Sequence, residues 1–475
     1  MHILNADLEK NISQIKNILH QTSDLEVRNI RIGVNSVEST VLYLQSLTNA
    51  MVLQEHILFP LLYGSFHEDQ EPPVTVGKIE RINSIDVAIS ALLEGNSILL
   101  IQGKNDGYQF ETKGWMQRSL QNTQNELSIK GTQQSLIESM NPNISLIRRY
   151  IPYSDLIINE INIAKKNKLS ILYLKNNIDE NVLKELQERL SKIHVDMILN
   201  TGELVEWIED DTYSPFPQFL ITERPDWIAK HLREGRITLI LDNSSQAIII
   251  PVNFLDFFKN IDDYGFKWYI ASFMRALRFI SFFISVFLPA IYVAAISYNC
   301  EIIPIQLLLS VAESRAKVPF PPILEAGLML LSLELMREAA IRLPTPIGVT
   351  IGIVSGTIIG QAAVQAGIVS NIMVIVIGIT ALASYSIPSY DMGITVSVLR
   401  LPLMILASCF GLIGITVGWM ILLAHLINLK SLNIPYGIPI VPLNFLTLLK
   451  DSLLRLPIKW IQKKRNEGVN IDKNR

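Results

Sequence analysis

The strongest constraint on the fold is an uneven distribution of charge. Residues 279–428 contain eleven charged side chains in 150 positions, whereas the other 325 residues carry 74. A helix needs about 20 predominantly apolar residues to cross a bilayer. Uncharged runs of at least that length permit four strong spans, which we place at 279–298, 347–366, 368–388 and 401–428. We therefore expect a soluble part followed by an all-α polytopic transmembrane bundle.

The segment 302–341 is harder to place in a membrane. Residues 302–311 are apolar but too short to cross, and residues 323–341 have the length but carry four charged side chains. Ionised groups are tolerated at membrane depth where they face protein or water. Two alternatives stay open for this uncertain membrane segment: a helix buried in the bundle, or part of a re-entrant hairpin.

The ends of the chain predict its topology. Residues 1–21 lack the apolar core of a signal peptide, so the long soluble region is expected in the cytoplasm. From residue 430 onward, nine basic side chains outnumber three acidic ones, and basic residues near a membrane favour the cytoplasmic side. Because both ends then lie on one side, we expect either four crossings plus a re-entrant segment, or six.

The soluble part contains a repeated pattern. Residues 86–102 and 226–242 match at a constant offset of 140 residues, each reading as an Asp-initiated helix, a glycine stop and an apolar strand. A second strand is expected after each copy, at 108–112 and 246–252. We infer two similar α/β subdomains, of which the second also contains a strand at 171–174 and a helix at 182–190.

These patterns divide the chain into five parts. The apolar spacing of residues 8–19 and 41–51 predicts a helical N-terminal segment over 1–60. The two cytoplasmic α/β subdomains follow at 61–140 and 141–265. The transmembrane domain is expected at 266–430, and a basic cytoplasmic tail at 431–475.

A glycine ladder lies within one expected span. Gly348, Gly352, Gly356 and Gly360 recur every four residues, which lets a neighbouring helix approach closely. One interpretation is a helix that moves during gating beside a permeation route. The other is static helix packing.

Several polar side chains in the bundle are candidates for an ion path. Glu334 and Glu338 share one helix face, whereas Glu325 faces elsewhere. Carboxylates that line a water-filled path attract cations. The alternatives are an ion-pair ladder with Arg337 and Arg342, or a helix that lies near the membrane interface. Further candidates at the ends of two spans, for a pore mouth or for helix capping, are Gln361, Gln365 and Asn371. Asp391 and Arg400 are expected to form a surface pair.

In the soluble part, Arg148 and Arg149 are candidates for a domain or subunit contact, with a solvated basic face as the alternative. The common phosphate-loop, zinc-protease and serine-hydrolase motifs are absent from the sequence. The seven histidines do not cluster at metal-ligand spacing, so we expect neither a metal site nor a cofactor, and no enzymatic activity. A net charge of −3 argues against nucleic-acid binding.

Four segments together resemble the A subunit of spore germinant receptors, the GerA family. They are NISLIRRYI at 143–151, SPFPQFLITERPDWIAKHLREGRI at 214–237, PFPPILEAGLMLLSLELMREAAIRLPTPIG at 319–348 and GTIIGQAAVQAGIVS at 356–370. The resemblance runs from about residue 40 to 445. Glu223 and Arg224, in the Thr-Glu-Arg-Pro part of the second segment, join the candidates for a domain or subunit contact.

The resemblance implies a function. Family members lie in the spore inner membrane with a large cytoplasmic N-domain of two similar α/β subdomains. They act with a permease-like B subunit, thought to bind the nutrient, and with a C lipoprotein. The A subunit would form a homo-pentameric, nutrient-gated cation channel in contact with membrane lipid and so start germination. A secondary transporter of a nutrient and a non-conducting membrane sensor or scaffold are the alternatives.

Overall fold

The computed structural model describes residues 3–33, 36–64, 71–114, 126, 128–165, 167–342, 360–441 and 454–457. The chain divides into two compact units. An α/β unit comprises Met1–Asp210, Phe219–Val252 and Ser431–Asn433, and a helical unit comprises Asp211–Gln218, Asn253–Lys430 and Ile434–Arg475. Each is described separately below.

The first α/β subdomain is a five-stranded antiparallel sheet in the order β1-β2-β4-β5-β3. Its elements are α1 (Leu8–Ile18), β1 (Leu25–Ile32), β2 (Val37–Leu44), α2 (Ala50–Val52), the π-helical segment η1 (Leu53–Leu58), α3 (Phe59–Tyr63), β3 (Ile79–Ile82), α4 (Ile85–Leu93), β4 (Ser97–Ile101) and β5 (Gly107–Phe110).

The second α/β subdomain repeats this order of elements. Its sheet runs β6-β7-β9-β10-β8, so that each strand takes the place of its counterpart in the first sheet. Its elements are α5 (Met140–Tyr150), β6 (Leu156–Asn162), β7 (Lys168–Leu174), α6 (Glu180–Ser191), α7 (Thr201–Ile208), β8 (Leu220–Thr222), α8 (Pro225–Arg233), β9 (Ile237–Leu241) and β10 (Ala247–Ile250).

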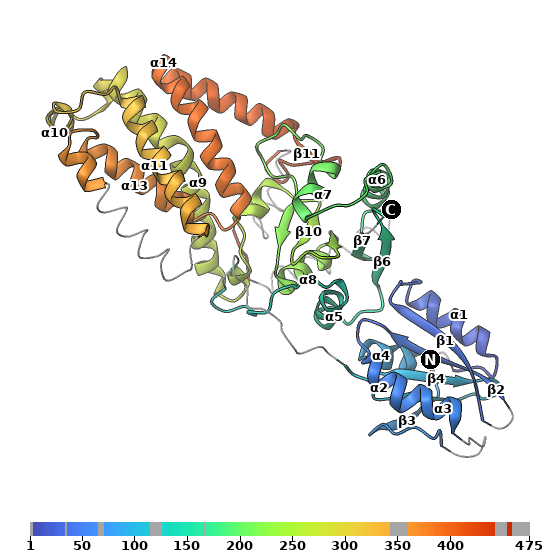
Figure 1. Ribbon diagram of the computed structural model, residues 1–475. Coiled ribbons are helices and arrows are strands. Elements are labelled where there is room, and N and C mark those ends of the chain that lie inside the picture. The colour runs from blue at the N-terminus through green and yellow to red at the C-terminus, as the bar shows by residue number, and fades with distance from the viewer. Residues whose placement is uncertain are drawn as a thin grey trace. The chain divides into compact units, whose positions relative to one another are not determined.

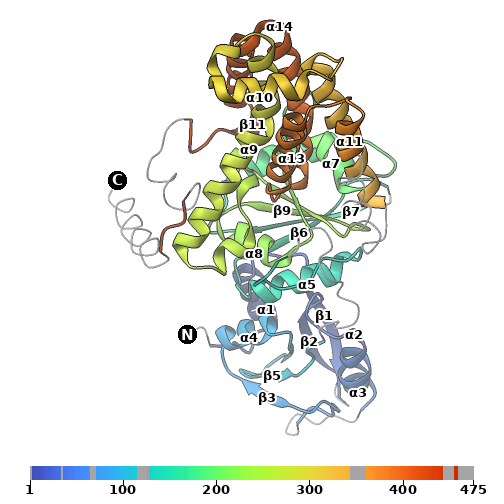
Figure 2. The same ribbon diagram turned by 90° about the vertical axis from the view of Figure 1, so that its left-hand side faces the viewer.

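Helices cover both faces of the sheets. In the first subdomain, one core joins α1 and α4 to one sheet face, and a second core joins η1 and α3 to the other. In the second, α5 packs against α8, and α8 against the sheet, while α7 contacts β10 from the opposite side (Figure 2). Burial on both faces explains why β4 and β9 are apolar without alternation.

The helix–glycine–strand repeat predicted from the sequence is confirmed. Helices α4 and α8 end before Gly95 and Gly235, whose φ angles are +89° and +87°. Such angles suit glycine because it has no Cβ. The predicted Asp caps are wrong by two residues. Ser84 and Arg224 occupy the cap positions, and Asp86 and Asp226 lie in the first turn, where their charge complements the helix dipole.

The prediction of helix throughout residues 1–60 is wrong for two segments. Strands β1 and β2 lie within that range and form one edge and the adjacent position of the first sheet. Four consecutive residues of β2, Ser39–Leu42, are buried, so this strand lacks the alternation by which strands are recognised. The apolar residues of β2 therefore recur at a spacing that is also typical of a helix.

The helical unit is built around α9. Its elements are η2 (Phe254–Phe258), η3 (Ile261–Tyr264), α9 (Trp268–Ser297), η4 (Cys300–Ile302), α10 (Ile305–Arg315), α11 (Pro322–Arg342), α13 (Asn371–Tyr385), α14 (Tyr390–Asn428) and the short strands β11 (Lys430–Ser431, of which Ser431 is assigned to the α/β unit) and β12 (Ile434–Pro435). Helix α9 packs against both α13 and α14. Among the described residues, α9 and α14 are long and apolar enough to cross a membrane.

One expected span of this unit differs in the structure, and the segment left open between the spans forms helices. Helix α14 is broken at Gly411, where φ is +61° and ψ is −141°, so residues 401–428 do not form one continuous helix (Figure 1). The segment 302–341 forms two helices, α10 and α11, separated by residues 316–321. Most of the expected span 347–366, and all of 343–359, lies outside the described residues.

Candidate functional site

Four helices of the helical unit bring together six polar side chains, which we call the polar core. Arg400 of α14 is 1% exposed and donates from Nε to the Ser285 carbonyl of α9 at 2.9 Å and from Nη2 to Ser285 Oγ at 2.8 Å. Its Nη1 lies 3.7 Å from Glu334 Oε1 of α11. The members are Ser285, Glu334, Arg337, Ser384, Ser397 and Arg400.

Arg337 completes the polar core from α11. Its Nη1 lies 3.0 Å from Glu334 Oε2 and donates to Ser397 Oγ of α14 at 2.7 Å. Its Nη2 donates to Ser384 Oγ of α13, also at 2.7 Å. One carboxylate thus lies between two guanidinium groups, and three serine hydroxyls accept hydrogen bonds from these groups. Such mutual compensation lowers the cost of burying charge among helices.

The expected surface pair of Asp391 and Arg400 is not formed. Arg400 is buried and directed at Ser285 and Glu334 instead. Arg400 was the one charged residue between 392 and 428, and a lone ionisable group in an apolar run signals a buried polar partner. The identity of that partner depends on residues 66 and 115 positions away.

Glu325 occupies a second buried polar site in the same unit. The side chain is 0% exposed, and its Oε1 accepts hydrogen bonds from the Ser370 amide and hydroxyl at the start of α13. Arg315 Nε of α10 lies 3.8 Å from Glu325 Oε2, and Tyr292 of α9 contacts the Ser370 hydroxyl. Glu325 of α11 therefore contacts α10 and the start of α13 directly, reaches α9 through Ser370, and is separated from solvent in the single chain.

The remaining ion-path candidates lie at the surface of the single chain. Glu338 is paired with Arg342 at 2.6 Å, and both side chains are more than half exposed. Gln361, Gln365 and Asn371 are also exposed. Gln361 and Gln365 lie on a helical stretch. Asn371 begins α13, and its main-chain amide donates to Ser314 Oγ. The structure does not bring these residues together with the polar core.

Most of the glycine ladder cannot be placed. Gly348, Gly352 and Gly356 lie outside the described residues. Gly360 is described, and a Cβ built on it would meet Val374 of α13 at an ordinary van der Waals distance of 3.8 Å. The ladder's role in packing or gating stays a prediction.

Arg148 joins the two α/β subdomains. Its guanidinium donates to both carboxylate oxygens of Asp24, from Nε at 2.9 Å and from Nη2 at 2.8 Å, and both side chains are buried. Thr22 and Ser46 hydroxyls also donate to Asp24. Burial by itself raises the pKa of Asp24, but the ion pair with Arg148 and these hydrogen bonds outweigh it and hold the pKa below its usual value.

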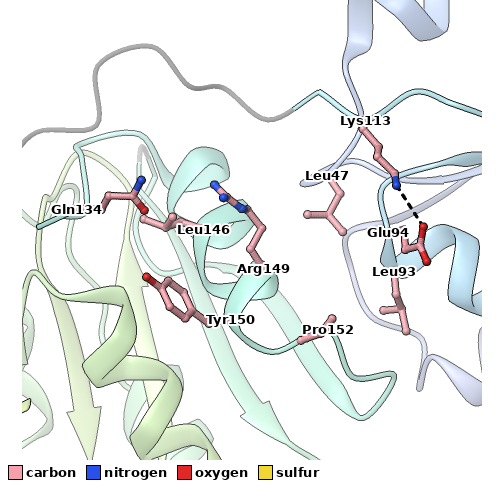
Figure 3. Close-up of a pocket in the computed structure, with 9 residues that line it drawn as sticks. All are labelled: Leu47, Leu93, Glu94, Lys113, Gln134, Leu146, Arg149, Tyr150 and Pro152. Carbon is pink, nitrogen blue, oxygen red and sulfur yellow. Dashed lines mark hydrogen bonds and ion pairs between the residues drawn. The ribbon is translucent and has the colours of Figure 1, made fainter. Parts of the chain in front are cut away.

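Arg149 contributes to a cleft of about 460 Å³ between the same subdomains (Figure 3). One wall carries Arg149 and Tyr150 of α5, and the other carries the Lys113–Glu94 ion pair. Gln134 and four mainly apolar residues complete the lining. The adjacent arginines therefore have different environments, since Arg148 is enclosed by protein and Arg149 faces the cleft.

Glu223 and Arg224 lie at the start of α8 and contact the linker between the two subdomains. The Glu223 carbonyl accepts the Leu136 amide at 2.8 Å, and Arg224 Nη2 donates to the Thr132 carbonyl at 2.9 Å. Arg224 also pairs with Asp226 at 2.8 Å. Among the described residues, no group of three or more His, Cys, Asp or Glu side chains is arranged to hold a metal ion.

These features define a class of protein: a duplicated α/β unit joined to a helical unit that has two helices long enough to cross a membrane and a polar core. A family model described as Bacillus/Clostridium GerA spore germination protein matches residues 13–467. Spore germination protein KA of Bacillus subtilis (strain 168) is 36% identical over 478 residues, covering 98% of this chain and 88% of the relative. The chain therefore belongs to the GerA family of spore germination proteins.

Two further similarities were found. YfkQ of Bacillus subtilis (strain 168), named as a membrane protein, is 34% identical over 474 residues, covering 98% of this chain and 92% of the relative. The crystal structure of the N-terminal domain of the A subunit of the Bacillus megaterium spore germinant receptor GerK3 has a TM-score of 0.40 and 24% identity. That similarity covers 53% of this chain and 97% of the other. Family membership and the two long apolar helices together indicate a membrane protein.

Proposed function

We propose that the chain is the A subunit of a nutrient germinant receptor in the spore inner membrane, where it forms an oligomeric, nutrient-gated cation channel. Its α/β unit would lie in the cytoplasm, and it would act with a permease-like B subunit and a C lipoprotein as a homo-pentamer. Family membership supports the receptor role. The observation that carries the channel proposal is the placement of acidic side chains along α11.

The acidic residues of helix α11 lie in different environments. Glu325 is buried and contacts Ser370 and Arg315, whereas Glu334 is partly exposed and lies between Arg337 and Arg400. Glu338 lies one turn beyond Glu334 and is exposed, paired only by the neighbouring Arg342 among the described residues. A carboxylate on the surface of a bundle is costly against lipid. It is suited to a wet path between subunits, where it would raise the local cation concentration.

The ion pair between Glu338 and Arg342 provides a test of the proposed channel. In the proposed channel, Glu338→Gln removes the attracting charge, whereas Arg342→Gln leaves it uncompensated. We therefore expect a several-fold lower cation conductance for Glu338→Gln and a higher one for Arg342→Gln. An exposed ion pair contributes roughly 0–1 kcal/mol to stability, so both variants should fold. The measurement is conductance and cation-to-anion selectivity of the purified chain with its companion subunits in planar bilayers, with amino acids and sugars as triggers.

Two control variants make the result specific. Glu338→Asp keeps the charge and should retain conductance, and Glu313→Gln removes an exposed carboxylate from α10 and should leave selectivity unchanged. Equal effects of Glu338→Gln and Arg342→Gln would contradict the path assignment and favour a structural ion pair. Absence of conductance in the wild-type assembly would contradict the channel itself. Uptake of labelled amino acid without ion current would instead favour a transporter.

A further inference from the structure

Helix α14 consists of two arms, residues 390–410 and 412–428, which meet at the break at Gly411 (Figure 1). Close to the break the arms pack against each other, since a Cβ built on Gly418 of the second arm would lie 2.6 Å from the Leu403 side chain of the first. Small residues permit such a close approach between helices. The two arms therefore form a helical hairpin whose ends lie away from Gly411.

The ends of the two arms are bridged by one short loop, residues 211–218, which we call the α14 brace. Thr395 Oγ1 of the first arm donates to the Pro215 carbonyl at 2.6 Å, and His425 Nε2 of the second arm lies 2.7 Å from Ser214 Oγ. A straight helix would separate residues 395 and 425 by about 45 Å, whereas the Cα atoms of adjacent residues are about 3.8 Å apart. Two consecutive loop residues can therefore reach both arms only because α14 is folded into a hairpin.

The α14 brace is closed at its base and packed at its tip. Gln218 Oε1 accepts the Asp211 amide at 3.1 Å, and Gln218 Nε2 donates to the Asp211 carbonyl at 2.6 Å, which joins the two ends of the loop. Between these ends, Phe216 is buried, stacks on the His425 ring at 6.0 Å and meets the Phe254 ring edge-on at 6.2 Å. The loop therefore has a fixed shape between its base and the arms.

Both ends of the α14 brace continue into the α/β unit, at Asp210 and at Phe219. The Asp210 carboxylate lies 2.8 Å from Arg189 Nη2 of α6 and accepts the Leu432 amide at 2.7 Å. Leu432 belongs to Ser431–Asn433, the segment after α14 that is assigned to the α/β unit. One carboxylate of the α/β unit thus fixes both the chain that enters the brace and the chain that leaves α14.

We propose that the α14 brace couples the α/β unit to the helical unit: through this loop, a change in the α/β unit sets how far apart the two arms of α14 lie. The contacts at the ends of the arms suit this role, because a hydrogen bond between neutral groups contributes little net stability and is readily exchanged. Packed helices then move between discrete arrangements. The coupling goes beyond the proposed channel, since it concerns the arrangement of α14 and is measured without ion flow.

Distances between spin labels on the two arms test the proposal in the full-length chain in nanodiscs. Cysteines for labelling replace the exposed Ile394 and Ile427, in a background that carries Cys300→Ser and Cys409→Ser. We expect one narrow distance distribution for this otherwise unchanged chain. Its mean should lie well below the roughly 50 Å that a straight helix would place between the two positions.

Two variants loosen the α14 brace itself. Phe216→Ala removes the packed ring, and Thr395→Val removes the hydrogen bond to the first arm while keeping the shape of the side chain. Each should broaden the distance distribution at least twofold. Two matched controls should give the unchanged distribution: Tyr213→Ala alters a side chain of the same loop that is 97% exposed, and Thr416→Val removes a hydroxyl that bonds to its own helix.

The coupling is tested by substitutions in the α/β unit. Arg189→Gln removes the cation that holds Asp210, and Asp210→Asn weakens the same anchor with little change of shape. Both should broaden the distribution between the arms, whereas Lys184→Gln, at an exposed position of the same helix α6, should not. Amide protection in β9 and β10 shows whether the second sheet stays folded in each variant.

Three results would overturn the proposal. A distribution that stays narrow in both Arg189→Gln and Asp210→Asn excludes coupling through the brace. A distribution that stays narrow in both Phe216→Ala and Thr395→Val shows that the brace does not hold the arms. A mean distance near that of a straight helix removes the hairpin on which the coupling depends. None of these results depends on conductance, so they are separate from a failure of the proposed channel.

Discussion

The two α/β subdomains have the same order of elements but use the helix after their third strand differently. In the first, the buried residues of α4 are all apolar: Ile85, Ala88, Ile89, Ala91 and Leu92. In the second, α8 buries His231 among apolar residues, and its N-cap residue Arg224 binds the linker. The same order of strands and helices therefore accommodates α4, which only packs in the core, and α8, which also binds the linker between the subdomains.

A buried polar side chain, His231, distinguishes α8 from α4, whose buried residues are all apolar. Trp227 covers the His231 ring at 4.5 Å, and Glu234 Oε2 lies 3.3 Å from its Nδ1. Buried polar groups are costly unless they are paired, so such positions make a subdomain dependent on a few residues. A core of apolar residues distributes its stability more evenly. We therefore expect the second copy to be more sensitive to pH and to single substitutions.

The largest expected loss of stability tests whether the first α/β subdomain depends on the second. Arg148→Ala leaves the buried Asp24 carboxylate of the first subdomain without its cation, and removing one partner of a buried ion pair costs about 3–5 kcal/mol. Hydrogen exchange in full-length protein should show the loss in β1 and β2 as well as in α5. Adding Asp24→Asn should restore part of the stability.

The neighbouring arginine is the control for that prediction. Arg149→Ala should cost far less, because Arg149 faces the cleft rather than a buried carboxylate (Figure 3). Similar losses for the two arginine variants would show that the Asp24 pair does not connect the subdomains energetically.

A smaller loss of stability is expected for the second subdomain at acidic pH. Burial lowers the pKa of His231 to about 3, with the charges of Arg236 and Lys230 adding to the shift. The unfolded histidine binds a proton below its ordinary pKa of 6.5, whereas the folded one does not until about pH 3. Stability of the second subdomain should therefore fall as pH decreases through this interval, by about 2 kcal/mol between pH 6.5 and 5. Thermal unfolding across this range is the measurement.

Variants of two histidines identify the source of that acid sensitivity. His231→Leu should flatten the pH dependence of the second subdomain, whereas His194→Leu, at an exposed histidine, should leave it unchanged. A wild-type slope retained in His231→Leu would mean that another group is responsible.

The smallest effect compares equivalent glycines. Gly95→Ala and Gly235→Ala both force alanine into a left-handed conformation, which costs roughly 1–2 kcal/mol. A Cβ at Gly235 would overlap the Asn177 carbonyl, whereas a Cβ at Gly95 would lie 2.9 Å from the Leu47 carbonyl. Gly235→Ala should therefore destabilise its subdomain more, as measured by local hydrogen exchange in β9 and β4. The reverse order would show that the two turns are not equivalent.

Local signals made part of this fold predictable. The apolar runs at 279–298 and 401–428 and the glycine after each repeat helix are properties of adjacent residues, so the two-part organisation and the helix–glycine–strand repeat could be recognised directly. Strand β2 could not, because it pairs with the distant strand β4 and is buried without alternation, and β1 in turn pairs only with β2 in this sheet. The sequence also did not show that the candidate site residue Glu325 is buried and Glu338 exposed, because both lie on helix α11.

The order of residues shows where the chain is rich in charge, where it is apolar, and that one α/β pattern occurs twice, because each depends on short-range composition and period. Which charges meet depends on how distant segments pack. Arg148 and Asp24 are 124 residues apart, Arg400 and Ser285 are 115 apart, and Thr222 and Glu126 are 96 apart. A side chain's charge is visible in the sequence, but the partner that compensates it is selected by packing between distant segments.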